Sequence, residues 1–226
     1  PMILDGHGAK LSKRTGAADV MQYRDAGYLP HALLNYLVRL GWSHGDQEVF
    51  SREELVQKFD VRDVNRAPAR FDMDKLTWLN QHYLKTDAPE KVALHLIPHL
   101  EDLHYAMSHG PNPAEIVVAL RDRVKTLKEM AEKARCWYEE FESYEAEAAA
   151  KHLVATAAQP LQAAHDALAA IAEGEWSPAT VDAALRQAAE QVGVGLGKVA
   201  QPLRVAITGS QVSPSIDQTV YLTGQK

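Results

Sequence analysis

Near the start of the chain, three cations and a hydroxyl stand within five consecutive residues. These are Lys10, Ser12, Lys13 and Arg14, with Leu11 between the first two. Ammonium and guanidinium groups on a loop stabilise the charge that builds on phosphate groups during their transfer. Flanking glycines let the backbone approach a phosphate and let the loop open and close. The spacing alone favours a solvated charged loop, because short basic motifs often arise by chance.

A second concentration of basic side chains lies between residues 121 and 135, where six Lys and Arg accompany three acids. The six are Arg121, Arg123, Lys125, Lys128, Lys133 and Arg135. On a helix, Arg121, Lys125 and Lys128 fall on one side, and such a strip can follow a phosphate backbone. The alternative is a solvated helix face whose cations pair with the neighbouring acids.

A third set of polar and apolar side chains lies in the last quarter of the chain. Its members are Gln201, Arg204, Thr208, Ser213, Pro214 and Ile216. Unstacked nucleic-acid bases bind to flat or apolar surfaces that also offer hydrogen-bond donors, and Arg204 with Pro214 and Ile216 provides both. Ser213 is expected to cap the final helix, and capping alone is an equally good account of that residue.

The composition limits the classes of protein to consider. The chain has 226 residues with 46% hydrophobic side chains, enough to bury a core in one large domain or a few small ones. Its net charge of −6 counts against nucleic acid, although the basic residues are concentrated and five acids stand apart at 139–147. The single cysteine, Cys136, excludes an internal disulfide and a Cys-rich zinc site. His95 and His99 are four residues apart, but no Glu follows His95 as in an H-E-x-x-H motif, Pro98 disturbs the turn and no Cys is near, so no metal site is predicted.

The hydrophobic pattern predicts an all-α chain with a minimal strand at the N-terminus. Helix signals include Pro30 at a first position, a capping box at Ser51–Glu54 and an N-cap at Asp72. Trp42 and Trp78 are expected in the core. Helices are predicted at 17–26, 30–40, 51–59, 72–84, 90–103 with an interruption at Pro98, 114–141, 145–158, 160–172, 178–193, 198–207 and 213–224. The pattern at 114–141 fits either one long helix or two helices that meet near Lys125 and Thr126.

Four stretches of the sequence together resemble the bacterial glutamyl-tRNA synthetase family, which belongs to the class I aminoacyl-tRNA synthetases. They are DGHGAKLSKRTGA at 5–17 and residues 21–51, 71–84 and 202–217. The resemblance implies a helical domain at 1–87 that carries the lysine loop and contacts the tRNA stem. It implies next a two-part α-helical anticodon-binding domain, a bundle or superhelical cage, at 88–144 and 145–226.

The resemblance also implies an activity, which is the attachment of glutamate to tRNA(Glu) with ATP through glutamyl-adenylate. Residues 10–14 (Lys10, Leu11, Ser12, Lys13 and Arg14) would bind ATP, with Lys13 as the main phosphate lysine and Lys10 as its partner. Arg121, Arg123 and Lys125 would bind the anticodon region, and the two arginines are the predicted base readers. The tail set of Gln201, Arg204, Thr208, Ser213, Pro214 and Ile216 would contact the anticodon loop.

The family's other signature, of the His-x-Gly-His type, does not occur in this sequence. We therefore expect a C-terminal half that binds tRNA without catalysis, as part of a cytoplasmic, monomeric enzyme. ATP with Mg²⁺ and L-glutamate would bind through the other half, and no cofactor is expected on this chain alone. The alternatives are a stand-alone helical RNA-binding module and a small nucleotide-binding helical enzyme.

Overall fold

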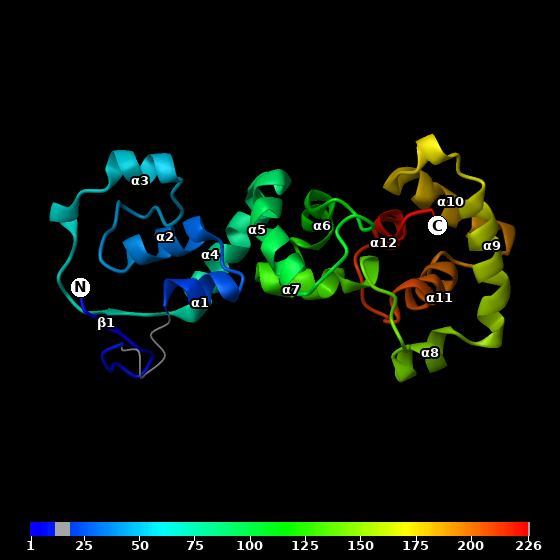
Figure 1. Cartoon of the computed structure of the whole chain (residues 1–226), viewed down its shortest axis with the longest axis horizontal. Helices are drawn as coiled ribbons and strands as arrows, with labels where there is room; N and C mark the ends of the chain where they lie inside the picture. Colours follow the sequence, from blue (N-terminus) through cyan, green and yellow to red (C-terminus); the bar gives the residue numbers. More distant parts are fainter. Residues whose placement is uncertain (12–18, 226) are drawn as a thin grey trace. The chain divides into compact units, whose positions relative to one another are not determined.

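A computed structural model describes residues 1–11 and 19–225, and the regular secondary structure of this part of the chain is almost entirely helical (Figure 1). Its one sheet joins β1 (Ile3–Leu4) to β2 (Ala69–Arg70) in parallel, with Ile3 opposite Ala69. The prediction of an all-α chain with a minimal N-terminal strand is confirmed. None of the described helices is long and apolar enough to cross a bilayer.

The helices are joined by segments of different lengths, of which 40–51 and 59–72 are among the longest. They are α1 (Val20–Asp25), α2 (Pro30–Arg39), α3 (Arg52–Lys58), α4 (Met73–Thr86), α5 (Pro89–Asp102), α6 (Pro113–Leu120), α7 (Leu127–Lys133), α8 (Ala146–His152), α9 (Ala158–Ala169), α10 (Pro178–Gln191), α11 (Gly197–Thr208) and α12 (Ile216–Thr223). Short 3₁₀ turns lie at 61–63, 134–137, 155–157 and 173–175.

The chain forms two compact units. The first contains residues 1–103 and 120–132, and the second contains 104–119 and the chain from 133 onward. The three domains predicted from the sequence, at 1–87, 88–144 and 145–226, were defined by their expected roles in tRNA recognition. That division stays a prediction.

Local signals set the helix starts in the first unit. The Ser51 hydroxyl accepts from the Glu54 amide at 3.1 Å, and the Glu54 carboxylate accepts from the Ser51 amide at 2.8 Å. The Asp72 carboxylate accepts from the amides of Asp74 and Lys75 and so caps α4. Both predicted caps are confirmed, because each depends only on residues within one helical turn.

A buried polar network joins α2 to α4. Asn35 is 0% exposed, and its side-chain carbonyl accepts from the Phe50 amide at 2.8 Å. Its side-chain amide donates to the Glu48 carbonyl at 2.9 Å. The Tyr83 hydroxyl lies 2.7 Å from Asn35 Oδ1 and 2.9 Å from the Phe50 carbonyl. These bonds hold the loop after α2 against α4.

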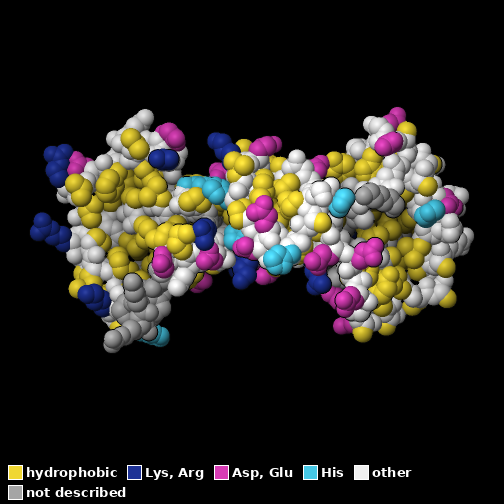
Figure 2. All heavy atoms as spheres, in the orientation of Figure 1, with side chains coloured by type: hydrophobic (Ala, Val, Ile, Leu, Met, Phe, Trp, Pro, Cys, Tyr) yellow, Lys and Arg dark blue, Asp and Glu magenta, His cyan; other side chains and the backbone are white. Residues whose placement is uncertain are grey.

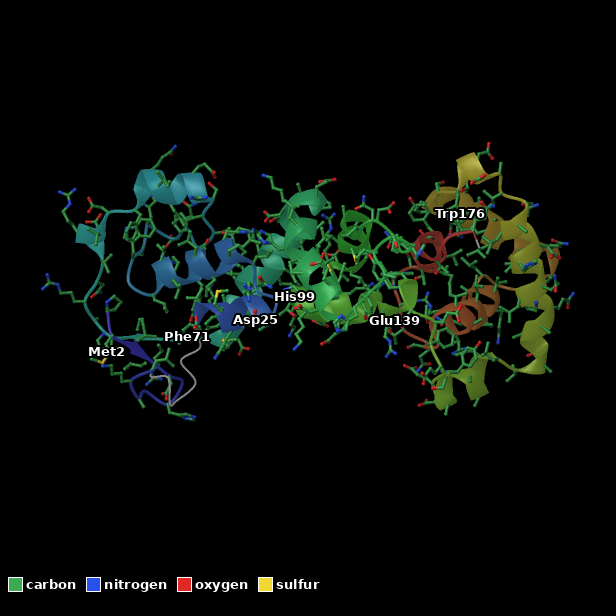
Figure 3. The ribbon with its side chains drawn as sticks, viewed as in Figure 1. Met2, Asp25, Phe71, His99, Glu139 and Trp176 are labelled. Atoms are coloured by element: carbon green, nitrogen blue, oxygen red, sulfur yellow. The ribbon has the colours of Figure 1, made fainter. Side chains whose placement is uncertain are left out.

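The second unit packs α9, α10, α11 and α12 around one apolar core, whose fully buried members include Val181, Leu185 and Val199. Two indoles fasten α12 to its surroundings. Trp137 donates to the Thr219 carbonyl at 3.2 Å, and Trp176 (Figure 3) donates to the Tyr221 carbonyl at 3.1 Å. Buried indole N–H groups need such partners.

The region 114–141 contains two helices, which is one of the two arrangements that the sequence allowed. The break lies at residues 121–126, because Val124 is buried there (1% exposed) and Thr126 starts a new helix by accepting from the Glu129 amide. Two other sequence predictions were wrong. Pro98 does not interrupt α5. Trp42 is in the core at 3% exposed, but Trp78 is 44% exposed because it lies on the outer face of α4.

Candidate nucleic-acid interface

The N-terminal loop begins with a turn built by Asp5. Its carboxylate accepts from the backbone amides of His7 and Ala9, both at 2.9 Å. The turn brings the backbone of Lys10 opposite Leu4, with the Lys10 side chain exposed. The Leu11 amide then donates to the Ile3 carbonyl at 2.9 Å. Of the five predicted ATP-binding residues, Lys10 and Leu11 are thus fixed to β1, and Ser12, Lys13 and Arg14 lie outside the described residues.

Arg121, Arg123 and Lys125 lie together on residues 121–126, which we call the basic turn. The helical strip predicted for Arg121 and Lys125 is wrong, because this segment is not helical. The turn is attached to α4, because the Asn80 side-chain amide donates to the Lys125 carbonyl at 2.6 Å. The buried Val124 also anchors it. These attachments place three cationic side chains on one short, fixed segment.

Glu129 orders the far end of the basic turn. Its carboxylate accepts from the Lys125 amide at 2.8 Å, while its own amide donates to Thr126 Oγ1 at 3.2 Å. This reciprocal pattern is close to a capping box, for which the sequence TLKE is a typical signal. That signal supports the arrangement with two helices that meet near Lys125 and Thr126.

In the second unit, Arg204 on α11 holds the loop at residues 209–215, which we call the tail loop. Arg204 Nη1 donates to the Ser213 carbonyl at 3.1 Å, the Ser213 hydroxyl at 2.9 Å and the Pro214 carbonyl at 2.8 Å. The Thr208 hydroxyl donates to the carbonyl of Arg204 at 2.8 Å. The structure therefore brings four of the six predicted tail residues into contact.

The prediction that Ser213 caps the final helix was wrong. The residue at the N-cap of α12 is Ser215, and its side chain makes no capping bond. The Ser213 hydroxyl instead contacts Arg204 and lies 2.9 Å from Thr219 Oγ1. The Thr219 hydroxyl, which is 0% exposed, also donates to the Ser215 carbonyl at 2.9 Å, so Ser213 belongs to a buried polar cluster before α12.

The other predicted tail residues are less accessible. Pro214 is buried, and Ile216 is 7% exposed and belongs to the core of the second unit. Gln201 on α11 is half-buried. The contact of these three residues with RNA stays a prediction.

An open groove of about 640 Å³ lies between α2, α3, α4 and α5, on the part of the first unit where hydrophobic side chains gather over α2 and α3 (Figure 2). Its lining includes the exposed Leu34 and Leu94. His31 Nε2 lies 2.7 Å from Asp87 Oδ2 at one side. The other charged groups in the lining are Arg52, Lys91 and Glu53. Because these charges are mixed in sign, the groove favours an anionic backbone less than the basic turn does.

Burial lowers the pKa of two histidines on α5, His95 and His99. His99 on α5 lies beside Asp25 at the end of α1 (Figure 3). Removal from water lowers the pKa of His99 below its ordinary value, and the opposing effect of the nearby carboxylates of Asp102 and Asp25 is smaller. The pKa of His95 is also lowered, first by burial and next by the proximity of His31. Among the described residues, no group of three or more His, Cys, Asp or Glu side chains is arranged to hold a metal ion.

Comparison with known protein families identifies the class. Residues 90–226 match the family described as anticodon binding domain, so the chain belongs to that family. Residues 1–78 match the model described as the catalytic domain of class I tRNA synthetases (E and Q).

Individual relatives agree with these matches. The chain is 62% identical over 226 residues to glutamate–tRNA ligases from Xanthomonas campestris pv. campestris (strain B100) and Xanthomonas euvesicatoria pv. vesicatoria (strain 85-10), covering 100% of this chain and 48% of each relative. A crystal structure of a glutamate tRNA ligase from Elizabethkingia meningosepticum in complex with its amino acid is similar with a TM-score of 0.80 at 26% identity, over 99% of this chain and 48% of that one. The chain thus spans about half the length of the relatives that it matches.

Proposed function

We propose that the chain is the tRNA-recognition half of a glutamate–tRNA ligase, which attaches glutamate to tRNA(Glu) with ATP through glutamyl-adenylate. The observation that carries this proposal is the 62% identity along all 226 residues to glutamate–tRNA ligases. The succession of a class I synthetase match and an anticodon-binding match in one chain supports it further. A stand-alone RNA-binding module would not be expected to contain the segment at 1–78 that matches the class I synthetase catalytic domain.

ATP is the nucleotide of the proposed reaction, and Mg²⁺ accompanies its phosphates. We assign the phosphate contacts to Lys13 with Lys10, and include Leu11, Ser12 and Arg14 in the same loop. Lys10 fits this role in that its side chain is exposed at the end of an ordered turn. An ammonium group there would stabilise charge on the departing pyrophosphate.

The partners follow from the same proposal. Arg121, Arg123 and Lys125 on the basic turn would bind the anticodon region of tRNA(Glu), since their cations lie on one fixed segment. The tail residues Gln201, Arg204, Thr208, Ser213, Pro214 and Ile216 would contact the anticodon loop. L-glutamate and ATP would bind through the other half of a monomeric, cytoplasmic enzyme. The functional division at 1–87, 88–144 and 145–226 belongs to this proposal.

Filter binding tests the proposal directly. The 226-residue chain should bind a tRNA(Glu) transcript more tightly than the same transcript with its anticodon exchanged, and it should show no pyrophosphate exchange by itself. Addition of a relative's N-terminal half should restore ligation. Equal affinity for both transcripts would contradict anticodon recognition and would support the stand-alone module.

A further inference from the structure

A tight turn precedes Lys10, and the Asp5 carboxylate holds it together. Asp5 Oδ1 accepts from the His7 and Ala9 amides, both at 2.9 Å. Among the described residues, neither of these two amides has another acceptor. The backbone closes the same turn, because the Asp5 amide donates to the Ala9 carbonyl at 2.8 Å and the Gly8 amide donates to the Asp5 carbonyl at 3.0 Å. One carboxylate thus orders the segment that leads into Lys10.

The turn sets the register of Lys10 against β1. Lys10 pairs with Leu4 in an antiparallel bridge, and the Leu11 amide donates to the Ile3 carbonyl at 2.9 Å. Residues that pair across two strands have their side chains on the same face, and a slip of one residue moves a side chain to the opposite face. The conformation of the turn therefore decides on which face the exposed Lys10 ammonium group lies.

A second cation lies on the face that carries Lys10. β1 pairs with β2 so that Leu4 lies opposite Arg70. Lys10 and Arg70 therefore project from the same face, on either side of Leu4. The Arg70 guanidinium reaches toward the turn, because a Cβ at Gly8 would lie 3.6 Å from Arg70 Nη2. An anionic group that approaches this face meets two positive charges, and a slipped Lys10 would leave Arg70 alone there.

The double role of one oxygen distinguishes Asp5 from an ordinary turn residue. Aspartate commonly accepts from the amide two residues further on, as Asp5 does from His7. Its Oδ1 also accepts from the amide of Ala9, which directly precedes Lys10. Both bonds lie at an exposed part of the chain, so water can replace them when the carboxylate is removed. Loss of the carboxylate should therefore loosen the register without unfolding the unit.

We propose that Asp5 is a positioning residue for the phosphate contact of Lys10. Its carboxylate fixes the turn, the turn fixes the register of Lys10 on β1, and the register keeps the ammonium group on the cationic face. Asp5 acts through Lys10, since its own negative charge repels a phosphate. The proposal rests on the proposed function, because it takes Lys10 as a contact to the departing pyrophosphate.

The test uses a chimaera that joins the N-terminal half of a 62%-identical relative to this chain, with pyrophosphate exchange as the assay. Two lost hydrogen bonds predict that Asp5→Ala lowers kcat about 10-fold. The KM for ATP should stay within about twofold, because Lys10 acts on charge that develops in the transition state. Asp5→Ser keeps a weaker acceptor in the turn and should recover part of the loss.

Asn112→Ala is the matched control for loss of a turn bond. The Asn112 side chain accepts from the Ala114 amide at 2.9 Å, in a similar turn of the second unit. The variant should exchange pyrophosphate like the parent chimaera.

A double-mutant cycle separates positioning from a general structural effect. In a Lys10→Ala background, Asp5→Ala should cause less than about a twofold further loss, because no ammonium group is left to position. The same fold-loss in both backgrounds, or parent-like exchange by Asp5→Ala, would overturn the inference and leave the proposed function intact. A parent chimaera without pyrophosphate exchange would overturn both.

Amide hydrogen exchange on the 226-residue chain tests the structural basis without the catalytic half. The His7 and Ala9 amides should exchange more slowly in the parent chain than in Asp5→Ala, since the carboxylate accepts from both. Asp5→Ser should lie between the two. Equal exchange rates in the parent and in Asp5→Ala would overturn the inference, whatever the activity of the chimaera.

Discussion

Asn35 offers the sharpest test of how the first unit is held together. Its replacement by alanine leaves the buried Phe50 amide without an acceptor and the Glu48 carbonyl without a donor. An unsatisfied buried N–H costs about 1–3 kcal/mol, and each lost hydrogen bond about 1 kcal/mol. We therefore expect Asn35→Ala to lower the free energy of unfolding of this unit by about 3–4 kcal/mol.

A milder change separates the parts of the network. Tyr83→Phe removes one hydroxyl, while Asn35 keeps its bond to the Phe50 amide at 2.8 Å. The expected loss is about 1 kcal/mol. Val56→Ala, at a side chain that is 79% exposed, should change stability by less than about 0.5 kcal/mol. The order of the three effects follows from which buried groups lose their partners.

Native-state hydrogen exchange is the suitable assay, because it reports α2 and α4 separately from the second unit. A loss of 3 kcal/mol corresponds to exchange about 150-fold faster in peptides that cover α2 and the loop after it. If Asn35→Ala costs less than about 1 kcal/mol, or no more than Tyr83→Phe, the network does not stabilise the unit as inferred.

Three further results are expected. Gly27→Ala should lower the stability of the first unit by about 3 kcal/mol or more in a urea titration, because Gly27 has a φ of +87° and a Cβ there would overlap the backbone amide of Lys128. Gly45→Ala is the control, because Gly45 has a φ of +55° and open space around the position of a Cβ. In the same urea titration it should lose only about 1 kcal/mol of stability, from backbone strain alone. Burial raises the pKa of Cys136 to about 11. At pH 8 its thiol should therefore react with iodoacetamide about 100-fold more slowly than a thiol with the ordinary pKa. Reaction at the rate of an exposed thiol would contradict this burial. Burial lowers the pKa of His99 in the folded chain, so the unfolded chain binds a proton more readily and the free energy of unfolding should fall as the pH drops below about 6.5. Urea titrations at pH 7.5 and 5.5 measure this fall. In His99→Gln the part of the fall that is due to His99 should vanish.

The local features of the fold were accessible from the sequence. The capping residues Ser51 and Asp72 make their bonds within one turn, so their types and spacing were sufficient. Most helix bounds agree with the predictions for the same reason. The motif around Lys13 and the tail around Arg204 also indicated the family before any fold was known, and the match of residues 90–226 to the anticodon binding domain confirms the class.

The sequence allowed either one helix or two over residues 114–141, and tertiary contacts decided between them. Helical spacing had placed Arg121 and Lys125 on one side of a helix. The burial of Val124 and the bond from Asn80, 45 positions earlier, instead hold the segment as a turn. A partner so distant along the chain adds free energy that local propensity does not contain, and this tertiary contribution decides the conformation.

By itself, the sequence determined the helical class, the caps and the order of the basic segments, because each depends on neighbouring residues. Only the tertiary structure decided which side chains are available. Trp42, in the loop after α2, and Trp78, on α4, are the same residue type and were both expected in the core, yet one is 3% and the other 44% exposed. Arg204 lies among apolar neighbours in the sequence, but the folded chain directs its guanidinium to the carbonyl of Ser213. Exposure and hydrogen-bond partners depend on which segments pack together, and that packing is a property of the whole unit.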